Sequence, residues 1–248
     1  MVVELQHSTF KNLKVFITGT SSGIGHAVSK AYLERGSIVY GIDNKNNKSL
    51  NLQFKNFEFH NCNVQNYKKM SLIVKKIFKK SKRIDVLINC AGIIDFKSIE
   101  KSTIDFWKKI IDVNLTGTFI SCKLIAPSMK KNKKGSIINV SSRAAKFGGL
   151  DETAYCASKF GVEGLSRSLY EECKKYNVFV NTITPGTPIK TSMSKKTYSD
   201  EKRKIWKDPY LISPAFLHLG VQTKSVINNK YIDAWQLTKK IKHKYKLN

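Results

Sequence analysis

The chain of 248 residues has the length of one large domain or two small ones, and 41% of it is hydrophobic, enough for a sizeable core. With 44 Lys and Arg against 18 Asp and Glu, the net charge is +26, which excludes an acidic solvating protein and raises nucleic acid or an anionic membrane as a partner. Only five of the basic residues are arginine, which nucleic-acid-binding surfaces use heavily for bidentate contacts. A composition rich in lysine and asparagine is therefore the favoured explanation of the charge.

The cysteines, the histidines and the first residues indicate a soluble, cytoplasmic protein. The five cysteines are widely spaced and lack a C-x-x-C pair, so they predict neither a disulfide framework nor a zinc cluster, and the five histidines lack metal-ligand spacing. Residues 1–10 lack the apolar run of a signal peptide, and no uninterrupted apolar stretch approaches the about 20 residues of a membrane span. We expect no metal and no membrane partner.

Short β-branched runs alternate with helical patterns along the chain. The runs cover residues 13–17, 37–42, 84–88, 135–140 and 178–183, and their nearly continuous apolar character is typical of strands buried on both faces of a parallel sheet. Helices are predicted over 67–78, from a capping box at Ser102 through Phe119, and from about Thr153 to Tyr176. The alternation predicts one α/β domain over residues 1–248, a Rossmann-type doubly wound parallel sheet with helices on both faces.

Residues 185–214 break this alternation. The segment is polar and irregular, and it contains Pro185, Pro188, Pro209 and Pro214. A stretch of this length without regular structure inside a compact domain is usually a functional lid or a disordered loop. We expect residues 187–214 to form a substrate-binding lid.

Glycines cluster where the first predicted strand meets its helix. Thr18 to Gly25 reads T-G-T-S-S-G-I-G, and glycines placed there permit a tight turn and let backbone N–H groups approach a pyrophosphate at the helix N-terminus. Asp43 ends the next strand, where its carboxylate can accept hydrogen bonds from an adenosine ribose, although a plain turn residue is the alternative. The glycine loop holds no Arg or Lys and Asn44 follows Asp43, which favours NAD over NADP, while Lys45 tempers this preference.

Four further motifs follow the glycine loop in order, each at the end of a predicted strand or on a predicted helix. They are the N-C-A-G of residues 89–92, Asn114 in D-V-N, Ser142 after the run 135–140, and Tyr155 with Lys159 in Y-x-x-x-K. Together with the T-G-x-x-x-G-I-G loop, this ordered set resembles the classical short-chain dehydrogenases/reductases, from about residue 13 to residue 185.

The resemblance implies hydride transfer between a nicotinamide cofactor and an alcohol or ketone. Tyr155 and Lys159 lie four apart on one helix, so the ammonium beside the phenol, with the positive oxidised nicotinamide, is expected to lower the tyrosine pKa. Tyr155 then acts as general acid or base, Ser142 polarises the substrate oxygen, and Asn114 positions a water that connects Lys159 to solvent. The implied catalytic residues are Asn114, Ser142, Tyr155 and Lys159.

The implied cofactor contacts extend over several loops at one edge of the sheet. They are Gly19, Ser21, Ser22, Gly23, Ile24, Gly25, Asp43, Asn63, Asn89, Ala91, Gly92, Tyr155, Lys159, Pro185, Gly186 and Ile189. Two residues depart from the family pattern, since Asn63 replaces a common acidic residue and Cys90 replaces an asparagine. The segment after Gly186 is one residue longer than usual, which leaves open whether Thr191 reaches the cofactor.

The catalytic helix also carries a stripe of small residues, namely Ala157, Gly161, Gly164 and Ser168. Interior helical glycines cost about 1 kcal/mol each relative to alanine, so close packing is expected to compensate. The resemblance implies a face between subunits, and packing onto the protein's own sheet is the equal alternative. We expect a homodimer or a homotetramer.

The sequence thus predicts an NAD(P)-dependent oxidoreductase, with NAD preferred, that acts on a small secondary alcohol or ketone. An extended-type epimerase or dehydratase with a Tyr–Lys pair is the nearest enzymatic alternative, and the loop spacing and short chain count against it. A dinucleotide-sensing or nucleic-acid-binding Rossmann protein is the alternative from a different class, suggested by the basic charge. Polar groups in residues 144–153 and in the lid hint at a polyol, sugar or hydroxy acid.

Overall fold

The fold is built on one parallel β-sheet. A computed structural model describes residues 7–46, 48–221 and 227–245, and within them seven strands follow the order β3-β2-β1-β4-β5-β6-β7. The strands are β1 (Lys14–Thr18), β2 (Ile38–Asp43), β3 (Phe57–Asn61), β4 (Val86–Asn89), β5 (Gly135–Val140), β6 (Val178–Thr184) and β7 (Tyr231–Asp233), all paired in parallel. The strand order reverses at β1, which pairs with both β2 and β4, and doubly wound folds bind ligands at such a point.

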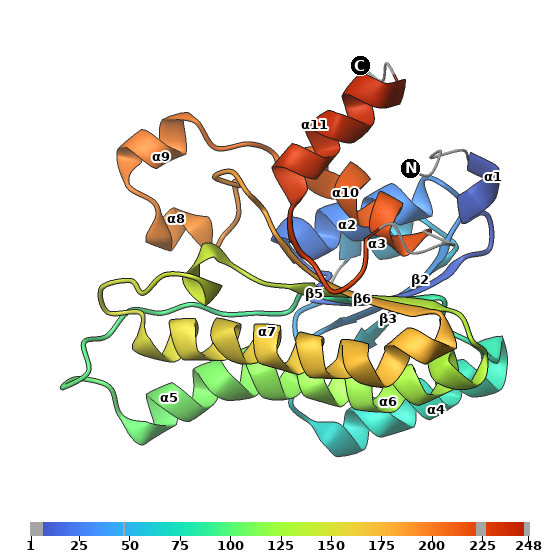
Figure 1. The fold of residues 1–248 in the computed structure, drawn as a ribbon, viewed down its shortest axis with the longest axis horizontal. Helices are drawn as coiled ribbons and strands as arrows, with labels where there is room; N and C mark the ends of the chain where they lie inside the picture. Colours follow the sequence, from blue (N-terminus) through green and yellow to red (C-terminus); the bar gives the residue numbers. More distant parts are fainter. Residues whose placement is uncertain (1–6, 47, 222–226, 246–248) are drawn as a thin grey trace.

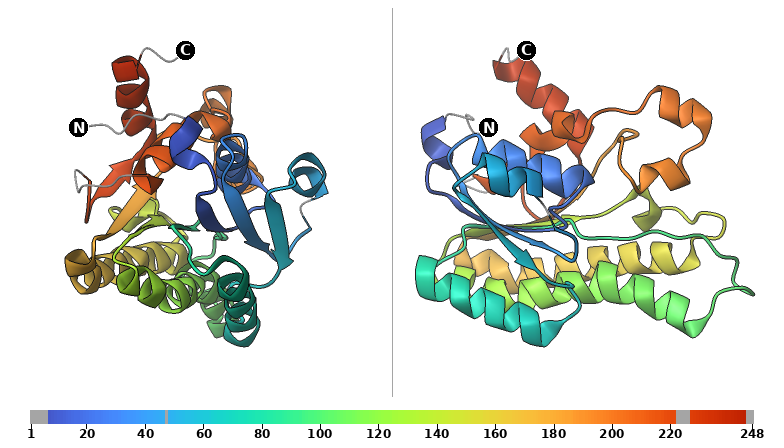
Figure 2. Two further views of the ribbon diagram at one scale, coloured as in Figure 1. Left: turned by 90° about the vertical axis from the view of Figure 1, so that its right-hand side faces the viewer. Right: turned by 180° about the vertical axis from the view of Figure 1, so that it is seen from behind.

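Helices cover both faces of the sheet, as predicted (Figure 1, Figure 2). One layer contains α1 (His7–Phe10), α2 (Gly23–Leu33), α3 (Lys48–Gln53), α10 (Ser213–Gly220) and α11 (Ala234–Tyr245). The opposite layer contains α4 (Tyr67–Ser81), α5 (Ile104–Ile111), α6 (Gly117–Lys131) and α7 (Thr153–Cys173). Each layer buries its own apolar cluster against the sheet, with Val28 and Phe216 in the first and Met70 and Ile125 in the second. The predicted doubly wound α/β class is confirmed.

The two edge strands, β3 and β7, are missing from the sequence-based prediction. β3 reads F-E-F-H-N and buries only Phe57 fully, while β7 has three half-buried residues. An edge strand has a neighbour on one side only, so it lacks the continuous apolar run that marks the five inner strands.

The long helix predicted from Ser102 consists of three consecutive segments. The side chain of Thr103 caps α5 by accepting the Phe106 N–H at 3.1 Å, so helix capping begins one residue later than predicted, and the Ser102 hydroxyl donates to the Ser98 carbonyl instead. A π-helical turn, η1 (Asp112–Thr116), then separates α5 from α6. The helical run Ile104–Lys131 is long and apolar enough to cross a membrane by length and composition, yet half of its apolar window is buried inside the fold.

The segment after β6 contains short helices, where the sequence pattern predicts irregular chain. These are α8 (Ser194–Thr197), α9 (Asp200–Lys204) and the 3-10 turn η4 (Pro209–Ile212), and a bridge between Ile189 and Lys207 joins the two arms of the segment. α8 and α9 project from the body beyond the sheet (Figure 1). Two further 3-10 turns, η2 (Arg143–Ala145) and η3 (Lys174–Tyr176), precede and follow α7.

Candidate active site

The glycine loop between β1 and α2 forms a cradle without room for side chains. Gly19 has a φ of +78°, and a Cβ there would lie 2.8 Å from the backbone of Ala91, while a Cβ on Gly25 would lie 2.1 Å from the Gly19 carbonyl oxygen. Ser22 precedes α2 with an extended backbone and does not cap it with its side chain, and Ile24 packs against the apolar cluster below. This bare backbone at a helix N-terminus fits the pyrophosphate of a dinucleotide.

Asp43 lies at the end of β2, beside the glycine loop. Its Oδ2 accepts the Ser21 N–H at 3.0 Å and its Oδ1 accepts the Lys45 N–H at 3.0 Å, so two backbone groups fix the carboxylate. Asn63 is exposed nearby, and its Oδ1 accepts a hydrogen bond from the Asn44 amide at 3.4 Å. The structure therefore brings Ser21, Asp43 and Asn63 to one end of the cradle.

Ser142, Tyr155 and Lys159 meet at the C-terminal edge of the sheet. Ser142 follows β5, and its hydroxyl accepts the Ala144 N–H at 3.2 Å. Its side chain lies beside the Tyr155 phenol and acts to lower the tyrosine pKa, and Tyr155 is 8% exposed. Lys159 is 5% exposed, and its Nζ lies 5.8 Å from the centre of the Tyr155 ring and donates to the Val140 carbonyl at 2.9 Å. The predicted trio is thus assembled in one place.

Burial shifts the pKa values of Tyr155 and Lys159 in opposite directions. It raises the pKa of Tyr155 to about 12, against the lowering effect of Ser142, and it lowers the pKa of Lys159 to about 8. The lowered tyrosine pKa is expected from Lys159 together with the oxidised nicotinamide and stays a prediction for the cofactor-bound protein, whereas in the protein alone lost solvation dominates. Near pH 7 the protein holds a neutral phenol beside an ammonium.

Asn114 is fixed beneath the trio by the π-helical turn. It is 1% exposed; its Oδ1 accepts the Ile93 N–H at 2.8 Å, and its amide donates to the Ile93 carbonyl at 2.9 Å and the Ser158 hydroxyl at 3.0 Å. A Cβ on Gly92 would lie 3.3 Å from the Asn114 Oδ1 and 3.8 Å from the Lys159 Nζ. Bare backbone at Gly92 therefore lets Asn114 and Lys159 approach the same point.

Two of the predicted cofactor residues turn their side chains into the protein. Asn89 is 3% exposed and donates to the Asn139 Oδ1 at 2.8 Å, which joins β4 to β5. Ile189 is 2% exposed. Ala91 is held differently, because its backbone N–H donates to the Thr18 hydroxyl at 3.1 Å and so ties the N-C-A-G loop to β1. Only the backbone of Asn89 and Ile189 is left to face a cofactor.

The chain after β6 returns to the glycine loop. Gly186 has a φ of +74°, and a Cβ there would overlap the Asp233 carboxylate, so this turn excludes other residues. Beyond it, the Thr191 Cγ2 lies 3.1 Å from where a Cβ of Gly23 would sit. Thr191, whose reach the sequence leaves open, is therefore placed against the cradle. The Pro185 carbonyl at the start of this arm accepts the Trp235 N–H at 3.1 Å.

Tyr231 joins the site without any signal in the sequence. Its hydroxyl donates to the Ser142 carbonyl at 3.1 Å, and the Lys146 Nζ lies 4.1 Å from the centre of its ring. Tyr231 belongs to the short edge strand that the sequence pattern misses, so its approach to Ser142 follows only from the three-dimensional fold. Among the described residues, no cluster of three or more His, Cys, Asp or Glu could hold a metal ion.

Known proteins share this architecture. The short chain dehydrogenase family model matches residues 13–202. A 3-oxoacyl-(acyl-carrier-protein) reductase of Thermotoga maritima is 34% identical over 186 residues, 73% of this chain and 75% of the relative. A D-threitol dehydrogenase of Mycolicibacterium smegmatis is 31% identical over 191 residues, 73% of this chain and 72% of that protein. The ligand-free aldohexose dehydrogenase of Thermoplasma acidophilum matches with a TM-score of 0.81 and 26% identity, over 93% of this chain and 96% of that one.

The fold and the ordered site define a nicotinamide-dependent oxidoreductase that acts on alcohol or keto groups. The chain belongs to the short-chain dehydrogenase/reductase family. The alternative of a dinucleotide-sensing or nucleic-acid-binding Rossmann protein is not favoured by these matches.

Proposed function

We propose that this protein transfers a hydride between NAD and a secondary alcohol or ketone, with Tyr155 as the proton-transfer residue. The observation that carries the proposal is the buried trio of Ser142, Tyr155 and Lys159 beside a glycine cradle that admits only backbone. When bound, the nicotinamide supplies the hydride acceptor or donor.

The chain's own residues bind the reacting oxygen and move its proton. Ser142 lies beside the Tyr155 phenol, and a substrate oxygen between them would receive a hydrogen bond from each. Neutral Tyr155 donates its proton to that oxygen when a ketone is reduced, and it takes the hydroxyl proton when an alcohol is oxidised. The Lys159 ammonium stabilises the phenolate, while Tyr231 and Asn114 hold the loops around the site.

The preference for NAD is supported by the surroundings of Asp43. The carboxylate is oriented by two backbone N–H groups at the end of the cradle, where it can accept hydrogen bonds from ribose hydroxyls. A 2′-phosphate in that position would meet the negative charge of Asp43. Asn44 and Asn63, which are hydrogen-bonded to each other at this end of the cradle, are uncharged, while the exposed Lys45 is the basic residue that follows Asn44.

The proposed function also includes a substrate-binding lid and an oligomeric assembly. We propose residues 187–214 as the lid of a single catalytic domain, and residues 144–153 as the facing wall of the substrate pocket. The protein is proposed to be cytoplasmic, which is supported by its five free cysteines. A homodimer or homotetramer is supported by Gly164, where an added Cβ meets only open space, whereas Gly161 packs against Leu115 of the same chain.

The test is a screen of NAD reduction over sugars, polyols, hydroxy acids and steroids, followed by Tyr155→Phe on the substrate found. Loss of the phenol hydroxyl removes the proton-transfer group, so kcat is expected to fall by at least about 100-fold. Tyr210→Phe is the matched control, because this partly exposed tyrosine lies on η4 and bonds to Glu34. Full turnover by Tyr155→Phe would refute the assignment.

A further inference from the structure

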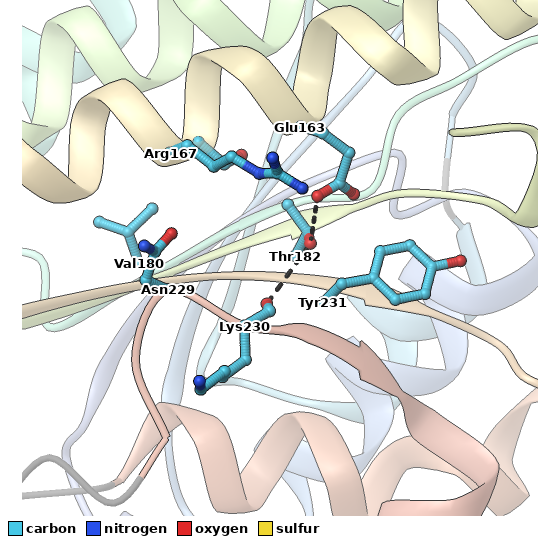
Figure 3. Close-up of a pocket in the computed structure, with 8 residues that line it drawn as sticks. Glu163, Arg167, Val180, Thr182, Asn229, Lys230 and Tyr231 are labelled. Atoms are coloured by element: carbon cyan, nitrogen blue, oxygen red, sulfur yellow. Dashed lines mark hydrogen bonds between the residues drawn. The ribbon is translucent and has the colours of Figure 1, made fainter. Parts of the chain in front are cut away.

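A buried carboxylate lies one helical turn beyond Lys159, behind the reacting face. Glu163 is 8% exposed and lines a cavity of about 230 Å³ formed by residues of α7, β6 and the edge at β7 (Figure 3). Its Oε2 accepts the Thr182 hydroxyl at 3.0 Å, whereas its Oε1 is buried and has no hydrogen-bond partner. Burying a carboxylate with one unpaired oxygen is costly, so a compensating interaction is expected.

Lys159 supplies the opposite charge. It precedes Glu163 by four residues on α7, so the two side chains leave the same face of the helix about 6 Å apart at Cβ. Both are buried, and the hydrogen bond of Lys159 goes to the Val140 carbonyl, a neutral acceptor. Burial lowers the pKa of Lys159 to about 8, and the Cys90 thiol and then the Glu163 carboxylate act in the raising direction.

The other titratable groups that face Lys159 are neutral. Burial raises the pKa of the Cys90 thiol and of the Tyr155 phenol, each to about 12, so neither carries a charge near pH 7. Of the two groups that raise the pKa of Lys159, Cys90 and then Glu163, the neutral Cys90 thiol supplies no charge near pH 7, which leaves the Glu163 carboxylate as the anion.

The charged groups around Glu163 itself are exposed to water. Arg167 lies one turn further along α7, Lys230 precedes β7, and both line the same cavity, but solvent screens exposed charges (Figure 3). Tyr231 is half-buried, and burial raises the pKa of its phenol, so it is neutral. The described residues form no ion pair with Glu163 within 4.0 Å.

We propose that Glu163 is a positioning residue for the reaction, whose carboxylate keeps the Lys159 ammonium charged and available to stabilise the Tyr155 phenolate. This inference rests on the proposed function. A purely structural role, as acceptor for the Thr182 hydroxyl, needs only a carbonyl oxygen, which a glutamine also provides. The negative charge is the property that glutamine lacks.

The experiment compares the pH dependence of kcat/KM in the native protein and in Glu163→Gln, on the substrate found by the NAD-reduction screen. The alkaline limb, where Lys159 loses its proton, is expected to move to lower pH by about one pH unit. Glu163→Asp keeps the negative charge, so its alkaline limb is expected to lie close to the native position. Thr182→Val removes the hydrogen bond but keeps the charge, so it leaves the limb in place, and Arg167→Gln does not move it to lower pH.

A second measurement does not depend on turnover. Trace acetylation of Lys159 by acetic anhydride across a pH series, read by mass spectrometry, follows the same titration in the free protein, and its midpoint is expected to fall in Glu163→Gln. An unmoved limb and midpoint in Glu163→Gln, or an equal shift in Thr182→Val, overturns the inference while Tyr155→Phe stays inactive. An active Tyr155→Phe overturns the proposed function instead.

Discussion

Single residues in this site carry charge at a cost to the fold. Lys159 is buried, and the lowering of its pKa to about 8 means that the folded chain loses this proton more easily than the unfolded chain does. Tyr155 keeps its proton up to a pKa of about 12 for the same reason, since burial disfavours its anion. Folding therefore buries two groups whose charged forms are more stable in water, and such a cost to stability is expected where activity requires buried charge.

Replacing the lysine should reveal this cost. Between pH 8 and pH 10.5 the unfolded chain binds more protons at Lys159 than the folded chain does, so native stability rises with pH across that window. Lys159→Met has no such group, so its stability relative to the native protein should drop by roughly 3 kcal/mol from pH 7 to above pH 10.5. Urea unfolding at pH 7, 9 and 10.5 measures the difference. A constant gap between the two proteins would show that Lys159 is not desolvated.

Cofactor choice should depend on Asp43. A bound dinucleotide stabilises the fold in proportion to the logarithm of its concentration over Kd, so thermal shifts report relative affinity. We expect a larger thermal shift with NAD than with NADP. Asp43→Asn removes the charge but keeps a hydrogen-bond acceptor, so the ratio of the NADP Kd to the NAD Kd should fall by about tenfold. Asn63→Ser changes a predicted cofactor contact without changing charge, so it should leave the difference between the NAD and NADP shifts in place. A larger native shift with NADP would contradict the preference.

The trio could be predicted from the sequence, but its surroundings could not. Ser142, Tyr155 and Lys159 sit in short motifs whose spacing alone places them together on a strand end and a helix. Thr191 and Tyr231 gain their positions from contacts between distant segments, and no local pattern encodes those contacts. The sign of the tyrosine pKa shift also depends on how completely the fold excludes water.

Helices and strands also divide into those that the sequence predicts and those that it does not. Inner strands such as β1 and β5 are covered on both faces, so their apolar runs identify them, whereas β3 and β7 at the edges are not recognisable from the pattern. The π-helical turn η1 is also invisible in the sequence, because a turn with one extra residue keeps the helical spacing on either side. That turn carries Asn114 into the site, so the missed irregularity is functional.

The whole molecule combines a large charge with exposed apolar side chains on the helices of one layer. On the α5–α7 side, Trp107, Phe119 and Phe160 are 38%, 47% and 50% exposed, and Gly164 follows Phe160 by one helical turn with open space beyond it. The helices carrying these residues lie in one layer of the molecule (Figure 1). Exposed apolar side chains favour association, while a net charge of +26 on each copy opposes it.

Because apolar contact favours association and charge repulsion opposes it, the oligomeric state should depend on salt concentration and on the residue at position 164. The native protein is expected to sediment at twice its 28.2 kDa, or a higher multiple, at about 0.15 M salt, where the Debye length is about 8 Å, and to dissociate at low ionic strength. Gly164→Arg should yield a monomer at both salt concentrations, because its side chain occupies the open space and adds charge. Arginine is also a better helix former than glycine by roughly 0.8 kcal/mol, so the folded monomer should not be weakened. Leu52→Arg, at an 86% exposed position on α3, is the matched control and should keep the native mass. A native protein that sediments as a monomer at every salt concentration would show that these exposed side chains have another role.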